Sequence, residues 1–448
     1  MNSAIFNPQT VAVIGATDRV GSVGRGLILN LKEGDRDLFY VNPGTDKVFE
    51  EKTYNNVLEI EKNIDLAIIA IPKTYVSEAV DDCIKKEVGG VIIISAGFAE
   101  TDQEGAERQK EIADKLKEAE IPLVGPNCLG ILRPPVNFNA SFAPATPKRG
   151  SLALISQSGA LIDSIIDGAK DQNYGFSLII SVGNAAGITL SEYIQIVAED
   201  EDTEVICLYI EGLKEGRRFL KVLKEIEKPV VVLKGGATEK AKKAISSHTG
   251  SLAGSHRIFS AALRQAGAFQ VNSLEELFNV AKALAWQPPC DKSIGVITNG
   301  GGAGVLLTDY LYDQNLVLAD VKEQTIKGIE EDMHPDFSKG NPLDIVGDAL
   351  PERYMKATEA FLDDPRVSAV VVIQTLQIMT DPIENAHRLV ELKKRYDKPI
   401  ITVYMGAGEE TKKGVRILEE NGIPNYSDPI KAAKPLKALN YKFKNLKK

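Results

Sequence analysis

The sequence has little of several residue types that often carry structure or chemistry. Its 448 residues include only four cysteines, four histidines and one tryptophan. The cysteines lie far apart and form no CxxC pair, which argues against a zinc site or a disulfide scaffold. No apolar run is long enough to cross a membrane, and no basic leader with an apolar stretch opens the chain. We therefore expect a cytoplasmic protein with no metal site and no membrane partner.

Neither sign of charge dominates the composition. There are 53 lysines and arginines against 62 aspartates and glutamates, which gives a net charge of -9. A nucleic-acid partner is not expected, because such partners attract strongly basic surfaces. Hydrophobic residues at 44% and charged residues at 26% are typical of an ordinary globular protein. The length fits about three domains of roughly 150 residues each.

Five nearly uniform apolar runs mark the first part of the chain. They are VAVIG, FYVNP, LAIIAIP, GGVIIIS and IPLVGP, and amphipathic stretches separate them. Strands that are covered on both faces need such runs, so the pattern predicts a doubly wound parallel sheet in an α/β, Rossmann-like domain over residues 1–130. The passage RPPVNFNASFAPATP breaks both periodicities and predicts a linker over residues 131–149.

The rest of the chain contains a weak internal repeat. SLALISQSG begins at Ser151 and SIGVITNGG at Ser293, an offset of 293 − 151 = 142 residues. The triplet DQN recurs at Asp171 and Asp313 with the same offset, 313 − 171 = 142. Two related α/β domains, residues 150–289 and 290–448, are the simplest explanation, and a chance match of short apolar strands is the alternative.

A glycine-rich turn follows the first apolar run. In GATDRVGSVGRG three glycines open a helix, which places backbone N–H groups and a positive helix end against a phosphate. The spacing is not GxGxxG, and the second run ends in Asn42 and Pro43 rather than in the acid that holds the ribose of a nicotinamide cofactor. We therefore expect a different adenine-containing phosphate ligand, and the alternative is a turn that serves only close helix packing. The expected ligand-binding residues are Gly15, Ala16, Thr17, Gly21, Gly24, Asn42, Pro43, Ile71, Pro72, Ser95, Ala96, Gly97 and Asn127.

A second turn of this kind follows the run SLALIS. The turn SQSG precedes an amphipathic helix, so hydroxyl and N–H groups at the helix start predict a second anion site. The turn is not the GxSxG of a serine hydrolase, and the chain contains no GxxxxGK[ST] motif of a P-loop. The ends of parallel strands meet at one edge of a sheet, so the next strand end joins this site. The expected phosphate-binding residues are Ser156, Gln157, Ser158, Gly159, Gly183 and Asn184.

His248 stands out among the histidines. It lies in SSHTGS, a run of small residues that suits a loop with one nucleophile better than a core. The strand EVICLYIEG ends in Glu211, at the sheet edge where the histidine loop is expected. A carboxylate that accepts a hydrogen bond from one imidazole nitrogen fixes the tautomer in which the other nitrogen can attack phosphorus. We therefore expect His248 and Glu211 to be catalytic. A solvated loop histidine and a surface acid are the alternatives.

Taken in order, the motifs resemble those of one enzyme family. VAVIGAT, VNP, ISAGF, GPNCLG, ISQSGAL, SVGN, YIEG, SSHTGSLAG and ITNGGGAG are similar to motifs of the α subunit of ADP-forming acetyl-CoA synthetase, a relative of succinyl-CoA synthetase. The resemblance covers essentially the whole chain. It implies that the first domain binds coenzyme A, that two flavodoxin-like ligase domains follow, that His248 is phosphorylated and that Glu211 hydrogen-bonds it.

The resemblance also implies a reaction and a partner. An acyl-CoA, ADP and phosphate become a carboxylic acid, ATP and coenzyme A through an acyl phosphate and a phosphohistidine. This chain has no recognisable ATP-grasp segment, so ADP or ATP with Mg²⁺ would bind a separate β subunit in a heterotetramer of two α and two β chains. A regulatory coenzyme-A-binding module without catalysis, a succinyl-CoA synthetase-like ligase for another acid and a nicotinamide-linked oxidoreductase are the alternatives.

Two positions depart from the family's pattern. Relatives usually carry a lysine after VNP, where this chain has Gly44 and Thr45 and its nearest lysine is Lys47. Succinyl-CoA synthetases have a tyrosine where this chain has Asp163. The resemblance therefore favours acetate or another monocarboxylate over a dicarboxylate as the acid.

Overall fold

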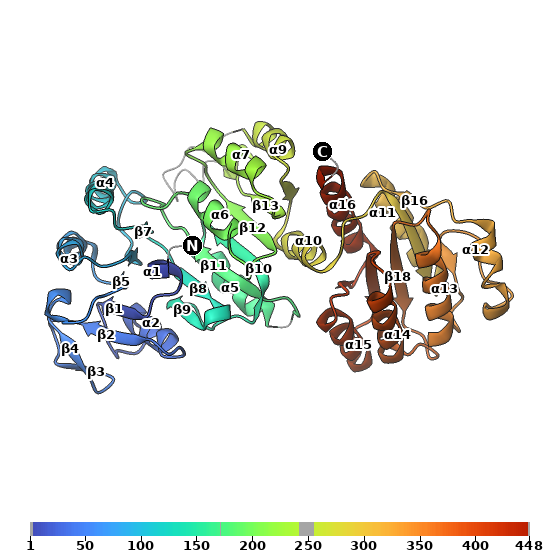
Figure 1. Cartoon of the computed structure of the whole chain (residues 1–448), viewed down its shortest axis with the longest axis horizontal. Helices are drawn as coiled ribbons and strands as arrows, with labels where there is room; N and C mark the ends of the chain where they lie inside the picture. Colours follow the sequence, from blue (N-terminus) through green and yellow to red (C-terminus); the bar gives the residue numbers. More distant parts are fainter. Residues whose placement is uncertain (1–2, 171, 242–254, 447–448) are drawn as a thin grey trace. The chain divides into compact units, whose positions relative to one another are not determined.

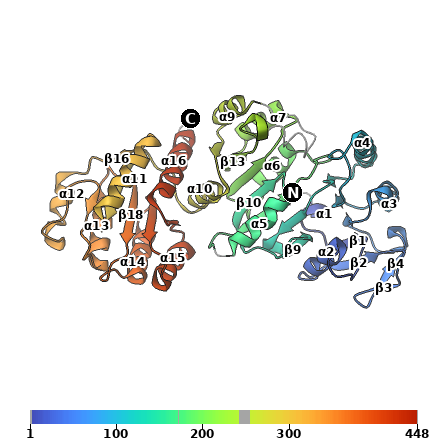
Figure 2. The ribbon, with the colours of Figure 1, turned by 180° about the vertical axis from the view of Figure 1, so that it is seen from behind.

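The computed structural model describes residues 3–170, 172–241 and 255–446. The chain divides into two compact units, residues 1–272 and 273–448. Figure 1 shows the first unit in blue to yellow-green and the second in yellow to red, and Figure 2 shows the same ribbon from behind. Within the described ranges, no helix combines the length and the apolar character needed to cross a membrane.

A sheet of seven strands forms the N-terminal part of the first unit, in the order β3-β4-β2-β1-β5-β6-β7. Its strands are β1 (Thr10–Ile14), β2 (Asp37–Val41), β3 (Lys47–Val48), β4 (Glu51–Tyr54), β5 (Leu66–Ile69), β6 (Val91–Ile93) and β7 (Leu123–Val124). The helices of this part are α1 (Ser3–Phe6), α2 (Val23–Leu31), α3 (Lys73–Lys85) and α4 (Gln103–Glu118). The strand pairs are parallel except for the β3–β4 hairpin.

Side chains of β1 alternate between two buried cores. Val13 belongs to the same core as Leu27 of α2, and Ile14 belongs to the core that contains Val76 of α3. Because both faces of the sheet are covered, its strands show no polar alternation. This is the pattern from which the sequence predicted a doubly wound sheet, and the structure confirms it.

A second sheet of seven strands completes the first unit, in the order β14-β13-β12-β10-β11-β8-β9. Its strands are β8 (Gly130–Arg133), β9 (Phe138–Ser141), β10 (Arg149–Ser156), β11 (Phe176–Ser181), β12 (Val205–Ile210), β13 (Val230–Lys234) and β14 (Phe269–Val271). Its helices include α5 (Gly159–Ala169), α6 (Leu190–Ala198), α7 (Gly216–Glu225) and α9 (His256–Gln265). From β10 to β14 the neighbouring strands are parallel, and they follow the flavodoxin-like order 2-1-3-4-5.

Residues 131–149 do not form the linker that the proline-rich sequence predicts. β8 and β9 form an antiparallel hairpin, and β8 pairs with β11 of the second sheet. Pro134 and Pro135 lie in the short helical turn between the two strands, where a missing N–H removes no bond between strands. Proline therefore interrupts the periodicity of the sequence without ending the sheet.

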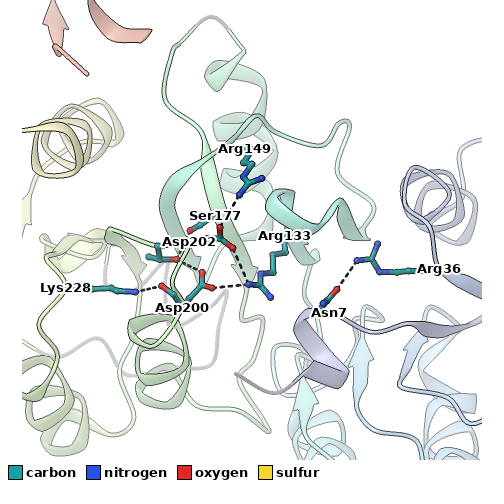
Figure 3. Close-up of polar contacts among 9 residues, drawn as sticks. Asn7, Arg36, Arg133, Arg149, Ser177, Asp200, Asp202 and Lys228 are labelled. Atoms are coloured by element: carbon teal, nitrogen blue, oxygen red, sulfur yellow. Dashed lines mark hydrogen bonds and ion pairs between the residues drawn. The ribbon is translucent and has the colours of Figure 1, made fainter. Parts of the chain in front are cut away.

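Charged side chains hold this hairpin in place. The guanidinium of Arg133 donates to Asp200 at 3.0 Å and lies 3.5 Å from Asp202, and both acids are in the loop before β12 (Figure 3). On the other side, Arg36 donates to the carbonyl oxygens of Val136 and Asn137, each at 2.9 Å. The hairpin is thus bound to the second sheet through Arg133 and to the N-terminal domain through Arg36.

The second unit repeats the flavodoxin-like arrangement. Its sheet has the order β16-β15-β18-β19-β20, with β17 paired to β15. The strands are β15 (Ser293–Thr298), β16 (Val317–Leu318), β17 (Leu343–Asp344), β18 (Ala369–Thr375), β19 (Ile400–Met405) and β20 (Asn425–Tyr426). The helices are α10 (Leu274–Trp286), α11 (Gly301–Asp313), α12 (Glu323–Lys327), α13 (Pro351–Asp363), α14 (Pro382–Arg395), α15 (Glu409–Glu420) and α16 (Pro429–Leu446). Without β17 the order is again 2-1-3-4-5, as expected for two related domains.

The second unit begins before residue 290, where the sequence placed the start of the last domain. α10 belongs to this unit. Its Lys282 forms a buried ion pair with Glu419 of α15, and the same ammonium group lies 5.0 Å from the centre of the Tyr426 ring. Separating α10 from this unit would leave buried charges without partners, which is costly.

Candidate functional site

The first cavity of the site lies at the switch point of the N-terminal sheet. β2 lies on one side of β1 and β5 on the other, and the carboxyl ends of such strands leave a crevice for a ligand. A cavity of about 960 Å³ occupies this place. The expected residues that line it are Gly15, Thr17, Gly21, Gly24, Asn42, Pro43, Ile71 and Pro72. Ala16 was also expected there, but it is fully buried and does not line the cavity.

Two glycines bring the backbone close together beside this cavity. Gly15 has a φ of +95°, and a Cβ at this position would lie 2.4 Å from the carbonyl oxygen of Ala70. A Cβ on Gly24 would lie 2.3 Å from the carbonyl oxygen of Gly15. The start of α2 therefore packs directly on the turn, where free N–H groups can meet a phosphate. Arg19, which the sequence reasoning missed, also lines the cavity and adds a positive charge. The cradle fits a phosphate-bearing ligand.

Asn42 shapes the neighbouring turn at the end of β2. Its side-chain amide donates to the carbonyl oxygen of Ala16 at 2.8 Å, and its Oδ1 accepts the N–H of Gly44 at 2.8 Å. A nicotinamide site would need a carboxylate at this strand end to hold the ribose. The structure therefore also argues against a nicotinamide cofactor, because an amide rather than a carboxylate stands at the end of β2.

A second cavity adjoins the first. It measures about 550 Å³ and shares Val23, Ala70 and Ile71 with the first cavity as lining residues. The expected residues that line it are Ser95, Ala96, Asn127, Gln157, Ser158 and Gly159. It thus joins the N-terminal domain to the SQSG turn of the second sheet, and the two cavities together can hold an elongated ligand.

Two of the expected residues do not line these cavities, and both form hydrogen bonds within their own turns instead. Gly97 donates its N–H to Glu100 Oε1 at 2.6 Å. Ser156 is fully buried, and its hydroxyl donates to the carbonyl oxygen of Ser158 at 2.8 Å and accepts the N–H of Ser158 at 3.0 Å. These bonds close the turns at the two strand ends, so neither residue is placed to meet a ligand.

Gln157 ties the SQSG turn to the end of β12. Its Oε1 accepts the N–H groups of Glu211 and Gly212 at 2.5 and 3.0 Å, and its Nε2 donates to the carbonyl oxygen of Gly212 at 2.9 Å. Glu211 is 7% exposed, and its carbonyl oxygen also accepts a bond from Lys234 of β13 at 2.7 Å. The structure therefore brings Glu211 and the SQSG turn together at one edge of the second sheet. His248, the expected partner of Glu211, lies outside the described residues.

Gln157 also lines a small third cavity. It measures about 130 Å³, and the expected residues Gly183 and Asn184 line it. The side-chain amide of Asn184 donates to Glu100 Oε2 at 2.6 Å and to Gln109 Oε1 at 2.8 Å. Its donors are therefore taken by the N-terminal domain. No sequence pattern indicates this, because Glu100 lies in the loop after β6 and Gln109 in α4, far from Asn184 along the chain.

Hydrogen bonds to Glu100 affect its titration. Burial by itself raises the pKa of Glu100, but bonds from the Asn184 side chain and from the N–H groups of Gly97 and Phe98 outweigh burial and leave the pKa lowered. These donors stabilise the charged carboxylate. Glu100 is thus an ionised anchor between the loop after β6 and the loop after β11.

The second unit contains the same turn geometry at the offset of 142 residues. Thr298 Oγ1 donates to the carbonyl oxygen of Gly300 at 2.9 Å and accepts its N–H at 3.0 Å. Asn299 donates to the carbonyl oxygen of Thr375 at 2.9 Å and accepts its N–H at 2.7 Å. The bonds of Thr298 match those of Ser156, and Asn299, like Gln157, bonds to the backbone at the end of the neighbouring strand. In the first unit Glu211 follows β12, and in the second unit Thr375 ends β18.

Three family models match successive parts of the chain. They are a CoA binding domain over residues 9–134, a succinyl-CoA ligase like flavodoxin domain over residues 149–284 and a ligase-CoA domain over residues 294–447. The solved structure of acetyl-coenzyme A synthetase 1 from Ca. Korarchaeum cryptofilum, in complex with phosphate and ADP, is 33% identical with a TM-score of 0.93. The match covers 99% of this chain and 97% of that one.

Curated relatives include divided and longer chains. The α subunit of ADP-forming acetate–CoA ligase II from Pyrococcus furiosus is 38% identical, over 98% of this chain and 98% of its own length. The ADP-forming acetate–CoA ligase of Methanocaldococcus jannaschii is 42% identical over 99% of this chain, which spans only 63% of that protein. The chain also spans less than two thirds of other relatives that it matches, at 63% and 64%. This chain belongs to the family of ADP-forming acetate–CoA ligases, and it corresponds to the α subunit of the members that are divided into subunits.

Proposed function

We propose that this chain is the α subunit of an ADP-forming acyl-CoA ligase. Its reaction would convert an acyl-CoA, ADP and phosphate into a carboxylic acid, ATP and coenzyme A. The observation that carries the proposal is the pair of adjoining cavities, which runs from the glycine cradle of the N-terminal sheet to the SQSG turn of the second sheet. The match to the ligases described above supports it.

Coenzyme A would bind along both cavities. The nucleotide and its phosphates would lie in the first cavity, where the start of α2 and Arg19 supply N–H groups and positive charge. The pantetheine arm would pass Val23 and Ile71, which line both cavities. The thioester would then reach the start of α5 in the second cavity, beside Ser158 and Gly159.

The first chemical step would take place at this helix start. An oxygen of inorganic phosphate attacks the thioester carbonyl, the C–S bond breaks, and coenzyme A leaves as a thiolate that takes up a proton. The acyl phosphate stays behind. Backbone N–H groups at the start of α5 would stabilise its negative charge, because the side chains of Ser156 and Gln157 already bond to the backbone. Placing groups and balancing charge is most of what a protein contributes to phosphoryl transfer.

His248 would then take the phosphoryl group. One imidazole nitrogen attacks phosphorus, the bond from phosphorus to the acyl oxygen breaks, and the carboxylate leaves. The other nitrogen keeps its proton and donates it in a hydrogen bond to an acceptor, which holds the imidazole in the reactive tautomer. The buried carboxylate of Glu211 is suited to be that acceptor. The phosphohistidine would finally pass the group to ADP.

The nucleotide would bind to a partner. We place ADP, with Mg²⁺ to neutralise its phosphates, on an ATP-grasp β subunit in a cytoplasmic assembly of two α and two β chains. The naming of the Pyrococcus furiosus relative as a subunit alpha supports a divided enzyme.

Phosphate labelling tests the proposal. The full chain is incubated with acetyl phosphate that carries radiolabelled phosphorus, and the label should survive base but not acid, as expected of a phosphohistidine. His248→Asn should abolish the label. His256→Asn is the matched control, because His256 begins α9 and lines none of the cavities described above, and this variant should keep it. Equal labelling of His248→Asn and the wild type would disprove the role of His248.

A second variant tests Glu211. Glu211→Gln should reduce the accumulation of the label and leave the affinity for coenzyme A unchanged, because Glu211 lines neither of the two coenzyme A cavities. An equal loss of labelling and of coenzyme A affinity would show damage to the fold rather than to the chemistry.

A further inference from the structure

The first chemical step of the proposed function moves one proton. Hydrogen phosphate brings an O–H group to the thioester, and coenzyme A leaves as a thiol. Phosphate therefore loses a proton in this step, and the sulfur of coenzyme A gains one. A positioned side chain that accepts this proton and then gives it up lowers the barrier of such a step.

Asp163 of α5 lines the second cavity and has the chemistry to carry this proton. Among the described residues that line this cavity, it is the one carboxyl group, and none is a lysine, an arginine, a histidine or a tyrosine. Asn127 and Gln157 are amides, which neither gain nor lose a proton near neutral pH. Burial raises the pKa of the Cys128 thiol to about 12, and the thiol donates to the carbonyl oxygen of Ile93 at 3.4 Å. Cys128 therefore keeps its proton.

Two hydroxyl groups of the same cavity already bond to the backbone. Ser95 Oγ donates to the carbonyl oxygen of Ile71 at 2.6 Å and accepts the N–H of Ile71 at 3.2 Å. Ser158 Oγ accepts the N–H of Leu161 at 3.4 Å and caps α5. Both hydroxyl groups hold the walls of the cavity, so the transfer of a proton falls to Asp163.

The surroundings of Asp163 help its carboxyl group to hold a proton. Asp163 Oδ1 is closed off from solvent and has no hydrogen-bond partner among the described residues. A carboxylate oxygen without a donor destabilises the charged form. Burial accordingly raises the pKa of Asp163 above its ordinary value. The carboxyl group therefore takes up a proton more readily than an exposed aspartate does, and it can still release the proton to a thiolate, which is the stronger base.

The position of Asp163 on α5 brings its carboxyl group to the place of the reaction. Asp163 follows Gly159 by four residues and Ala160 by three, so all three lie on one face of the helix. The Cα atoms of Gly159 and Asp163 are about 6 Å apart along the helix axis, and the side chain leans back toward the helix start. Gly159 and Ala160 line the same cavity. On this face of α5, no side chain larger than a methyl group separates the carboxyl group from the helix start.

We propose that Asp163 carries the proton between phosphate and the sulfur of coenzyme A. The inference rests on the proposed function, and it adds a catalytic residue to the first step. The carboxylate of Asp163 accepts the O–H proton of hydrogen phosphate while the phosphate oxygen bonds to the acyl carbon. The C–S bond breaks, its electron pair stays on sulfur, and Asp163 gives the proton to the sulfur.

The same group serves the opposite direction. The carboxylate takes the proton of the thiol, the sulfur attacks the acyl carbon of the acyl phosphate, and the departing phosphate takes the proton from Asp163. Phosphate and carboxylate can lie side by side here, because the O–H of hydrogen phosphate donates a hydrogen bond to Asp163. The N–H groups at the start of α5 balance the remaining negative charge.

Arsenolysis of acetyl-CoA by the full chain isolates this step. Arsenate replaces phosphate, the acyl arsenate that forms breaks down in water, and a thiol reagent measures the coenzyme A that is released. The reading needs neither His248 nor ADP. We expect Asp163→Asn and Asp163→Ala to lower kcat for thiol release at least about 100-fold. The dissociation constant for coenzyme A, measured by titration calorimetry, should stay within about twofold of the wild type, because the N–H groups that bind it are unchanged.

Formate distinguishes a proton carrier from a carboxylate that only supports the fold. The space left by Asp163→Ala opens onto a cavity of about 550 Å³, so formate can enter and carry the proton instead. Added formate should raise the rate of Asp163→Ala at least about tenfold and leave the wild type unchanged. Asp167→Ala is the matched control, because Asp167 lies one turn further along α5, where it is exposed and pairs with Lys170 at 2.8 Å. This variant should keep the wild-type rate without formate.

The outcomes separate this inference from the proposed function. If the wild type releases no thiol with arsenate, the proposed function fails. If the wild type releases thiol and Asp163→Asn matches its rate, the role of Asp163 is disproved and the proposed function stands. If Asp163→Ala loses the rate and formate restores none of it, the inference is likewise disproved, because the carboxylate then supports the fold rather than the transfer of a proton.

Discussion

Substitution of Gly24 by alanine tests the glycine cradle most directly. The added Cβ would lie 2.3 Å from the carbonyl oxygen of Gly15 and 3.2 Å from Thr17 Cγ2, whereas ordinary contact begins near 3.4 Å. The start of α2 would have to retreat by about 3.4 − 2.3 = 1.1 Å. Gly15 cannot give way easily, because its N–H donates to the carbonyl oxygen of Val41 at 3.0 Å. Overpacking of this severity costs about 3 kcal/mol. The better helix propensity of alanine returns about 1 kcal/mol, so the net loss should be about 2 kcal/mol.

Calorimetry measures both consequences of Gly24→Ala. The transition temperature of the first unit should fall by about 4 °C. The dissociation constant for coenzyme A should rise at least about tenfold, because the N–H groups of α2 withdraw from the cavity. Gly168→Ala is the control, since a Cβ on Gly168 of α5 meets nothing within 4 Å and should leave binding unchanged. Wild-type affinity and wild-type stability in Gly24→Ala would refute the assignment of the cradle as a ligand site.

Two other predictions concern charged side chains of the first unit. Arg133→Ala should increase hydrogen exchange of the β8–β9 amides about tenfold or more, because Asp200, with 3% side-chain exposure, loses its charged partner and keeps only the hydroxyl of Thr203 among the described residues. Arg149→Ala removes an exposed ion pair and should change exchange little. Similar exchange in both variants would contradict this. Glu100→Gln should lower the thermal stability at neutral pH. The lowered pKa of Glu100 stabilises the fold above the pKa of the unfolded chain, and this contribution is lost as the pH falls through the folded-state pKa. The difference between wild type and Glu100→Gln should therefore shrink below about pH 4, and a difference independent of pH would contradict it.

The sequence predicted those parts of the fold that local pattern controls. The apolar runs VAVIG and LAIIAIP form the buried strands β1 and β5, and the offset of 142 residues marks two sheets of the same strand order. The β8–β9 hairpin could not be predicted in this way. Its pairing depends on Arg133 and on the edge of β11, both of which come together only in the folded chain.

The residues of the site likewise include some that the sequence predicts and some whose contacts it does not predict. Glycines at a strand end can be read from the sequence, because close backbone approach excludes every other residue at Gly15 and Gly24. The partner that a polar side chain takes cannot be read, since it depends on packing between sheets. Asn184 was expected to meet phosphate, and its amide is bound to Glu100 of the N-terminal domain instead.

A comparison of the two repeats shows which hydrogen bonds at the SQSG turn belong to the fold that both repeats share. The hydrogen bonds of Gln157 to the neighbouring strand have a counterpart at Asn299 of the second unit. The segment of the second unit that matches the His248 segment, MGAGEETKKGVRILEENG, contains no histidine. A contact present in both copies serves the fold that they share, so the side chain of Gln157 holds the turn to the neighbouring strand. What differs is the end of that strand, with Glu211 in the first unit and Thr375 in the second. The proposed phosphoryl chemistry would therefore use the two residue types that the second copy does not have at these places, the carboxylate of Glu211 and the imidazole of His248.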